Sequence, residues 1–110
     1  MTKFETFVGK DNEHYFRLVN EDGRILLSSE GYTKKDSLMN GIKSVMNNIT
    51  DPKNCDLKST DSGKYFFNLK AANGQVIGKS AFWDSKDLRD EWVKRMTWEV
   101  PKSEIVESKN

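Results

Sequence analysis

Residue types that carry distinctive chemistry are scarce in this chain of 110 residues, which has one Cys, one His and two Pro. A lone Cys can form no intramolecular disulfide and no CxxC metal or redox site, and this favours a reducing compartment. One Cys and one His also cannot supply the usual ligands of a zinc site. We therefore expect a cytoplasmic protein with no metal and no cofactor.

Long apolar runs and an excess of one charge are lacking as well. The chain has no run of 18 consecutive apolar residues and no apolar stretch near its start that would be typical of a signal peptide, so we expect neither secretion nor a membrane span. Its 18 Lys and Arg residues nearly balance 17 Asp and Glu residues. A formal charge of +1 argues against strong, sequence-independent binding to nucleic acid. A chain of this length can fold as one domain, residues 1–110, without a covalent staple.

The chain contains an internal repeat, which appears when the sequence is shifted by 51 residues, the difference between positions 16 and 67. The shift aligns six identical pairs without a gap: Phe16 with Phe67, Leu18 with Leu69, Gly23 with Gly74, Ser29 with Ser80, Lys35 with Lys86 and Asp36 with Asp87. Self-similarity at one fixed spacing indicates two copies of one structural unit. We place repeat 1 at about 3–53 and repeat 2 at about 54–107, within a single domain.

Each repeat contains a hairpin signal, Asp22-Gly23 in the first and Asn73-Gly74 in the second. These dipeptides are typical of two-residue type I′ turns, which need a positive φ at both positions. Counting outward from the turns predicts these opposed pairs: Glu21 with Arg24, Asn20 with Ile25, Val19 with Leu26, Leu18 with Leu27, Phe16 with Ser29, Ala71 with Val76, Leu69 with Gly78 and Phe67 with Ser80. Because strand side chains alternate, one face forms the core from Phe16, Leu18, Ile25, Leu27, Phe67, Leu69, Ala71 and Val76. The small residues Ser29, Gly78 and Ser80 on that face would let a helix approach closely.

A helix follows each hairpin, at 34–48 and 85–97, and we expect Thr33 and Asp84 as their N-caps. Apolar spacing predicts the buried stripes Leu38, Ile42, Val45 and Ile49 in the first helix and Leu88, Trp92 and Met96 in the second. Further strands are expected at 4–8, 55–59 and 104–107. The fold class is therefore α+β: two β-β-β-α-β motifs forming a single antiparallel sheet, with both helices packed on one face.

The segment 64–80, KYFFNLKAANGQVIGKS, and the related segment 15–32 resemble the repeat of the bacterial YegP-like proteins, a family of unknown function. The resemblance implies tandem motifs whose C-terminal strands are exchanged between the halves, and a monomer with an internal pseudo-dyad. It implies no catalytic residues. This sequence departs from the family at Trp92, which replaces a small residue, and at Trp98.

Catalytic patterns are missing from the sequence. His14 lies at a predicted strand start with no Cys nearby, and Cys55 is expected to be a small buried hydrophobe. The acidic stretch 84–90 does not follow the calcium-loop pattern, and the glycines do not form a phosphate-binding loop. We therefore expect no enzyme.

The sheet face opposite the core face, which we call the open face, is the remaining candidate site. Alternation places these residues on it: Tyr15, Arg17, Val19, Leu26, Phe66, Asn68, Lys70, Ile77 and Lys79. Tyr15, Arg17, Phe66, Asn68, Lys70 and Lys79 are the candidate partner-binding residues. Aromatic and basic residues on an open sheet can stack single-stranded bases and contact phosphates, whereas antiparallel sheets also commonly expose a mixed face with no function. We expect a binding or protein-interaction module, with weak single-stranded nucleic-acid binding as the alternative.

Overall fold

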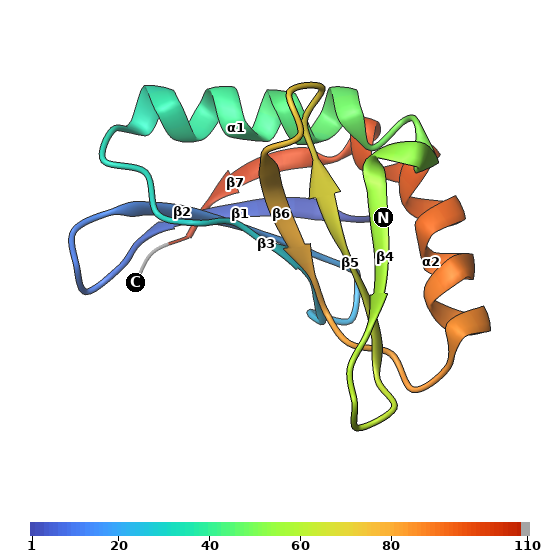
Figure 1. Ribbon diagram of the computed structural model, residues 1–110. Coiled ribbons are helices and arrows are strands. Elements are labelled where there is room, and N and C mark those ends of the chain that lie inside the picture. The colour runs from blue at the N-terminus through green and yellow to red at the C-terminus, as the bar shows by residue number, and fades with distance from the viewer. Residues whose placement is uncertain (109–110) are drawn as a thin grey trace.

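The computed structural model describes residues 1–108, which form one seven-stranded sheet and two α-helices (Figure 1). The elements are β1 (Lys3–Val8), β2 (His14–Val19), β3 (Ile25–Ser28), α1 (Lys35–Asn48), β4 (Cys55–Ser59), β5 (Tyr65–Lys70), β6 (Val76–Ser80), α2 (Lys86–Glu99) and β7 (Glu104–Glu107). Short 3-10 helices, Pro52–Asn54 and Val100–Lys102, precede β4 and β7. These bounds lie close to the predicted ones.

The strand order across the sheet is β4-β5-β6-β3-β2-β1-β7. All neighbours are antiparallel except β1 and β7, which run parallel, so the prediction of a purely antiparallel sheet is wrong for that pair. The physical reason is that β7 follows a helix, and such a crossover can return a strand in the parallel direction. The two halves meet through the short pairing of Leu27 with Ser80 and Ser28 with Lys79. In Figure 1, β4–β6 therefore run steeply across β1–β3.

The four hairpin loops within residues 1–108 all have three residues, including the two at Asp22-Gly23 and Asn73-Gly74 that were predicted to have two. In one of them, the Asn20 N–H donates to the Arg24 carbonyl at 3.0 Å, and the Gly23 N–H donates to the Asn20 carbonyl at 3.0 Å. The loops that begin at Gly9, Thr60 and Ala71 repeat this pattern. In each loop only the last of the three loop residues has a positive φ. These residues are Asn12, Gly23, Gly63 and Gly74. The predicted type I′ turns are wrong because they need two such residues.

The longer loops shift the register of both hairpins beside the turn. Leu18 pairs with Leu27 as predicted, but Val19 pairs with Ile25, so Leu26 is an extra residue in a β-bulge. The bulge turns Leu26 into the core, where it is fully buried, and leaves Ile25 exposed. The predictions of Ile25 in the core and Leu26 on the open face are therefore wrong, as is the pairing of Val19 with Leu26. Val19 is itself buried.

The second hairpin has the same bulge at the equivalent position. Lys70 pairs with Val76, and Ala71 bonds to Gln75 rather than to the predicted Val76. The extra residue here is Ile77, which packs against the core instead of lying on the open face.

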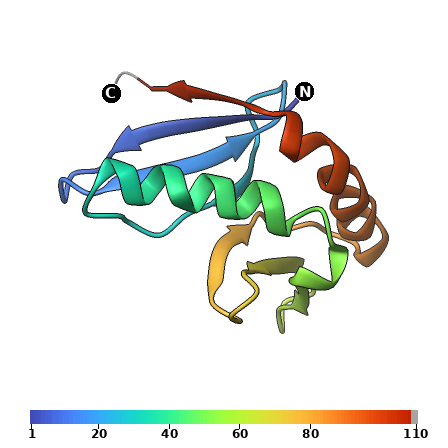
Figure 2. The same ribbon diagram turned by 90° about the horizontal axis from the view of Figure 1, so that it is seen from above.

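Both helices contribute to one hydrophobic core, and α1 contacts strands of both halves, β2, β5 and β6 (Figure 2). The predicted stripe of α1 is buried: Leu38, Ile42, Val45 and Ile49. In α2, however, Arg89, Val93, Met96 and Glu99 are buried, whereas Leu88 is exposed and Trp92 is only partly buried. The predicted stripe of α2 is therefore wrong except at Met96. Shifting the α1 stripe by 51 residues predicts Arg89, Val93, Met96 and Val100, which are all buried. The position within the repeat decides which side of α2 is buried.

Local contacts at the helix starts and at the small core residues also differ from the predictions. The N-cap of α1 is Lys34, which makes no side-chain cap, and that of α2 is Ser85, whose hydroxyl accepts from the Leu88 N–H at 3.1 Å. Thr33 and Asp84 are thus not caps. The Ser29 and Ser80 hydroxyls accept from the N–H groups of Phe16 and Phe67, at 2.9 and 2.8 Å. Gly78 is covered by the Leu27 side chain rather than by a helix.

Candidate functional site

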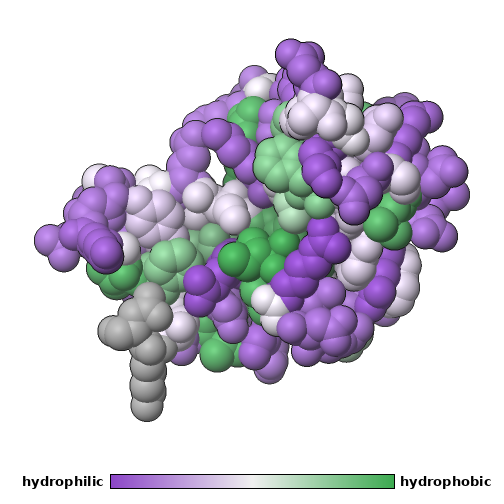
Figure 3. Space-filling view, turned by 90° about the horizontal axis from the view of Figure 1, so that it is seen from below, coloured by the Kyte–Doolittle hydropathy of each residue, from purple (hydrophilic) through white to green (hydrophobic). Residues whose placement is uncertain are grey.

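The open face carries apolar surface in its middle, with hydrophilic side chains around and between the apolar ones (Figure 3). The six candidate residues lie on β2, β5 and β6, and alternate along the strands with the buried residues Phe16, Leu18, Phe67 and Leu69. Tyr15 and Arg17 belong to one half of the sheet, whereas Phe66, Asn68, Lys70 and Lys79 belong to the other. The candidate residues therefore form two clusters rather than one.

The first cluster is built on β1 and β2. The rings of Phe7 and Tyr15 are stacked, with centroids 5.5 Å apart and planes 14° apart. The Arg17 guanidinium lies 4.7 Å from the Phe7 centroid, and its Nε donates to Glu5 Oε1 at 2.8 Å. The Tyr15 hydroxyl donates to the Asp11 carboxylate, which raises the pKa of Tyr15 to about 12 and lowers that of Asp11. In this cluster two stacked rings and a guanidinium contact one another. The Arg17 guanidinium and the Tyr15 hydroxyl are already hydrogen-bonded to carboxylates of the fold.

The second cluster is built on β4, β5 and the segment after β6. The Phe66 and Phe82 rings meet edge to face, 5.2 Å apart and at 63°, and Phe82 is 55% exposed. Asp56 Oδ2 lies 3.2 Å from Lys70 Nζ and 3.5 Å from Lys58 Nζ, and the hydrogen bond from Lys70 lowers the pKa of Asp56. An exposed aromatic pair therefore lies beside one carboxylate that faces two ammonium groups.

Most of the positive charge in the candidate set is neutralised within the fold. Arg17 pairs with Glu5 and Lys70 pairs with Asp56. Lys79, which is opposite Asn68 on the neighbouring strand, has no carboxylate within 4.0 Å among residues 1–108. A phosphate chain on this face would have to compete with two existing ion pairs, which weakens binding that rests on Lys and Arg contacts.

Sequence reasoning missed four residues of these clusters: Glu5, Phe7, Asp56 and Phe82. The first three follow from the pairing of β1 with β2 and of β4 with β5, which places Phe7 opposite Tyr15 and Asp56 opposite Asn68. The repeat did not point to Phe82 as a site residue, because the equivalent position in repeat 1 is Gly31.

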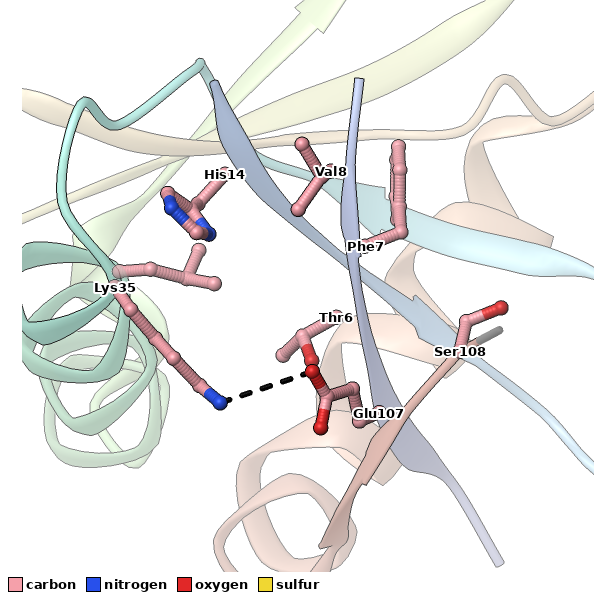
Figure 4. Close-up of a pocket in the computed structure, with 8 residues that line it drawn as sticks. Thr6, Phe7, Val8, His14, Lys35, Glu107 and Ser108 are labelled. Atoms are coloured by element: carbon pink, nitrogen blue, oxygen red, sulfur yellow. Dashed lines mark ion pairs between the residues drawn. The ribbon is translucent and has the colours of Figure 1, made fainter. Parts of the chain in front are cut away.

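A small cavity lies between β1, β7 and α1, and His14 is one of the residues that line it (Figure 4). Its volume is about 60 Å³, well below the roughly 300–1,000 Å³ of ligand-binding pockets. Lys35 Nζ and Glu107 Oε1 lie 3.7 Å apart at its rim. The cavity is therefore too small for a substrate larger than a few atoms.

His14 and Cys55 do not meet. Their strands, β2 and β4, are separated by four steps in the strand order, roughly 19 Å along the sheet at about 4.8 Å per step. Cys55 is buried, and burial raises the pKa of its thiol to about 11. The thiol therefore stays protonated near neutral pH, and the imidazole cannot activate it.

Within residues 1–108, no group of three or more His, Cys, Asp or Glu side chains is placed to hold a metal ion. No helix in that part of the chain is long and apolar enough to cross a membrane.

Trp92, where the sequence departs from the resembled family, is partly buried against the core and also lines a surface depression on α2. The Arg95 guanidinium lies 4.7 Å from a Trp92 ring centroid, and Arg95 Nε donates to the buried Glu99 carboxylate at 2.6 Å. The departure thus changes the packing of one helix face and leaves the open face untouched.

Comparison with known proteins places the chain among bacterial proteins of unknown function. The family described as "Domain of unknown function (DUF1508)" matches residues 10–56 and again residues 61–107. The UPF0339 protein encoded in the 5′ region of the ptx operon of Stutzerimonas stutzeri is 36% identical over 107 residues, covering 97% of this chain and 96% of that protein. The UPF0339 protein YegP of Escherichia coli K12 is 39% identical over 87 residues, which is 79% of each chain.

A solved structure agrees with this grouping. The solution NMR structure of E. coli YegP, a protein of unknown function, superposes with a TM-score of 0.88 at 32% identity and covers 97% of this chain and 92% of that one. The double family match, the identity over nearly the whole length and the shared fold agree with one another. The chain belongs to the YegP-like UPF0339 family and matches the DUF1508 domain twice.

Proposed function

We propose that this protein is a cytoplasmic, non-enzymatic binding module that engages a protein partner through the open face. The observation that supports this proposal is the pair of aromatic clusters in which Arg17 and Lys70 are already ion-paired, to Glu5 and Asp56. Aromatic residues are enriched in protein interfaces and dominate their binding energy, whereas unpaired Lys and Arg are what nucleic acid requires. Phe82, more than half exposed, is the residue we expect at the centre of the contact.

The test compares two double variants. Phe66→Thr with Phe82→Ser removes the second aromatic cluster while keeping a strand-forming residue at position 66. Leu88→Ser with Trp98→Ser removes exposed apolar side chains of α2 and serves as the matched control. Both variants must retain the circular dichroism spectrum of the wild type.

We expect proteins retained from a bacterial lysate by the immobilised wild type and by the α2 variant to be lost from the open-face variant. A purified retained protein should then shift open-face amides of the isotope-labelled chain. Equal retention by all three proteins would contradict the proposal.

The alternative, weak single-stranded nucleic-acid binding, is favoured by Lys79, the one cation of the candidate set that has no carboxylate within 4.0 Å among residues 1–108. It predicts shifts at Phe66 and Lys79 with an oligothymidine at low salt that vanish as salt rises. Saturable oligonucleotide binding at physiological salt would favour this alternative over a protein partner.

We further propose that strand exchange joins the two repeats, about 3–53 and about 54–107, into one domain. This is supported by the pairing of β7, which follows α2 in repeat 2 yet pairs with β1 of repeat 1. Deleting residues 102–110 should therefore destabilise both halves and lower the urea midpoint in a single transition. An unchanged midpoint would show that β7 is a dispensable tail.

A further inference from the structure

The outer edges of β1 and β4 are equivalent in the two repeats, but only one of them is covered by another strand. The pairing of Cys55 with Leu69 repeats that of Phe4 with Leu18, so β4 is the counterpart of β1 in repeat 2. β7 covers the outer edge of β1, but among residues 1–108 no strand lies beyond β4 (Figure 1). An uncovered edge exposes backbone groups that can pair with another strand.

The hydrogen-bond alternation identifies the outward backbone groups. The Thr60 N–H donates to the Lys64 carbonyl at 2.8 Å, so in an antiparallel ladder the N–H and C=O groups of Leu57 and Ser59 point away from β5. Those of Cys55 do so as well, but its N–H already donates to the Pro52 carbonyl. The same counting in repeat 1 turns Thr6 outward. There the Ser108 N–H donates to the Thr6 carbonyl at 2.7 Å, which confirms the counting on the covered edge.

Side chains at the two edges show what a strand beside β4 would contact. Thr6 is only 6% exposed beside β7, whereas its counterpart Leu57 is 48% exposed. In repeat 1, Lys35 of α1 pairs with Glu107 of β7 at 3.7 Å. Its counterpart Lys86 is two-thirds exposed and has only Asp90 at 4.0 Å. An apolar side chain and a weakly paired cation therefore border the open edge.

We propose that the outer edge of β4 binds an extended acidic and apolar segment of a partner protein as an added parallel strand, in the register that β7 uses on β1. In that register Ile105 is opposite Phe4 and Glu107 is opposite Thr6. The bound segment therefore places an apolar residue opposite Cys55 and an acidic residue opposite Leu57. The methylene groups of the acidic side chain then pack against Leu57, and its carboxylate lies at Lys86. Backbone bonds supply affinity, and these two positions supply specificity.

The probe is a peptide with the sequence of residues 101–108 and blocked ends, because this segment already shows the required pattern within the fold. Titrated into the full-length labelled protein, it should shift the amides of Leu57 and Ser59 saturably and slow their hydrogen exchange. The amides of Phe4 and Thr6 should remain unchanged.

Two sets of variants test the geometry. Leu57→Pro removes an outward N–H without removing a bond to β5, and proline is tolerated on edge strands with that orientation. We expect at least tenfold weaker binding, and Ser59→Pro supplies a second variant if Leu57→Pro does not fold. Lys86→Glu should weaken binding severalfold, and a peptide carrying Glu107→Lys should restore it, whereas Lys94→Glu, on the same helix, should have little effect.

Several results would overturn the proposal. Shifts at Phe4 and Thr6 would mean that the peptide replaces β7, and concentration-dependent shifts of β4 amides without peptide would mean that a second copy covers this edge. Unchanged binding by Leu57→Pro, or no shifts at millimolar peptide, would also overturn it. None of these results affects the open-face proposal, because the Phe66 and Phe82 variants leave β4 intact.

Discussion

Leu27 and Gly78 hold equivalent positions in the two repeats and contact each other at the junction of the sheet halves. A Cβ atom added at Gly78 would lie 2.9 Å from Leu27 Cδ2 and 3.0 Å from Leu27 Cγ. Leu27 is fully buried, so its side chain has little room to move away. The two halves therefore fit together only if one of the two positions is a large residue and the other lacks a side chain.

The size of the effect follows from this overlap. Gly78→Ala adds a methyl group to a filled space, which costs about 1–3 kcal/mol of folding stability. The substitution also lowers the conformational entropy of the unfolded chain, which offsets about 0.4–1 kcal/mol of that loss. We expect a net loss of about 1–2 kcal/mol. Leu27→Ala leaves a cavity and should cost about 2–5 kcal/mol. In the double variant the alanine at 78 partly fills that cavity, so the losses should fall short of their sum by about 1–2 kcal/mol.

The assay is urea unfolding of the wild type, both single variants and the double variant, followed by circular dichroism. With a slope of about 1–3 kcal/mol per molar urea, Gly78→Ala alone should lower the midpoint by about 0.5–1.5 M. Lys43→Ala combined with Gly78→Ala is the additive control, because Lys43 is exposed on α1. Additivity of the Leu27 and Gly78 losses within about 0.5 kcal/mol would refute the reasoning.

Three further predictions concern separate features. Gly41→Ala should not stabilise the protein despite the roughly 1 kcal/mol helix preference of alanine, because the added Cβ would lie 2.8 Å from Tyr32 Cζ. In a Tyr32→Ser background the same substitution should raise the urea midpoint. In an ultraviolet difference titration, one tyrosine should ionise near a pKa of about 12, and Asp11→Asn should move that pKa toward 10. Because the folded pKa lies above the ordinary value of 10, this hydrogen bond favours folding below pH 10 and its contribution is lost as pH rises through about 12. Sedimentation equilibrium at micromolar concentration should give the monomer mass of 12.7 kDa, and a stable dimer would contradict the internal pseudo-dyad.

Strand positions and helix lengths were predictable from the sequence because the repeat supplied each signal twice. Local hydropathy nevertheless misplaced the buried face of α2, where it favoured Leu88 over Arg89. Arg89 is 3% exposed: its Nη1 donates to the Lys58 carbonyl at 2.9 Å, and its guanidinium lies 5.5 Å from the Tyr65 ring centroid. A buried arginine satisfied by backbone and ring contacts has no signature in an apolar pattern, and the alignment with Leu38 is the signal that could have identified it.

The turns could not be assigned from Asp-Gly and Asn-Gly alone, because two-residue and three-residue loops both place glycine at a positive φ. One additional loop residue changes which neighbour faces the core, and this interchanged Ile25 and Leu26. Asn20 carried an overlooked signal: its side-chain oxygen accepts from the N–H groups of Asp22 and Arg24, at 3.0 and 2.9 Å, which fixes the longer loop.

The character of the open face depends on cross-strand partners that composition does not show. Glu5 and Asp56 are related by the 51-residue shift, and each neutralises a cation of the candidate set, Arg17 in repeat 1 and Lys70 in repeat 2. An acidic residue at the same position of both halves therefore holds one cation of each half in an ion pair. A surface that exposes aromatic rings while part of its positive charge is held in ion pairs suits a protein partner better than a phosphate backbone.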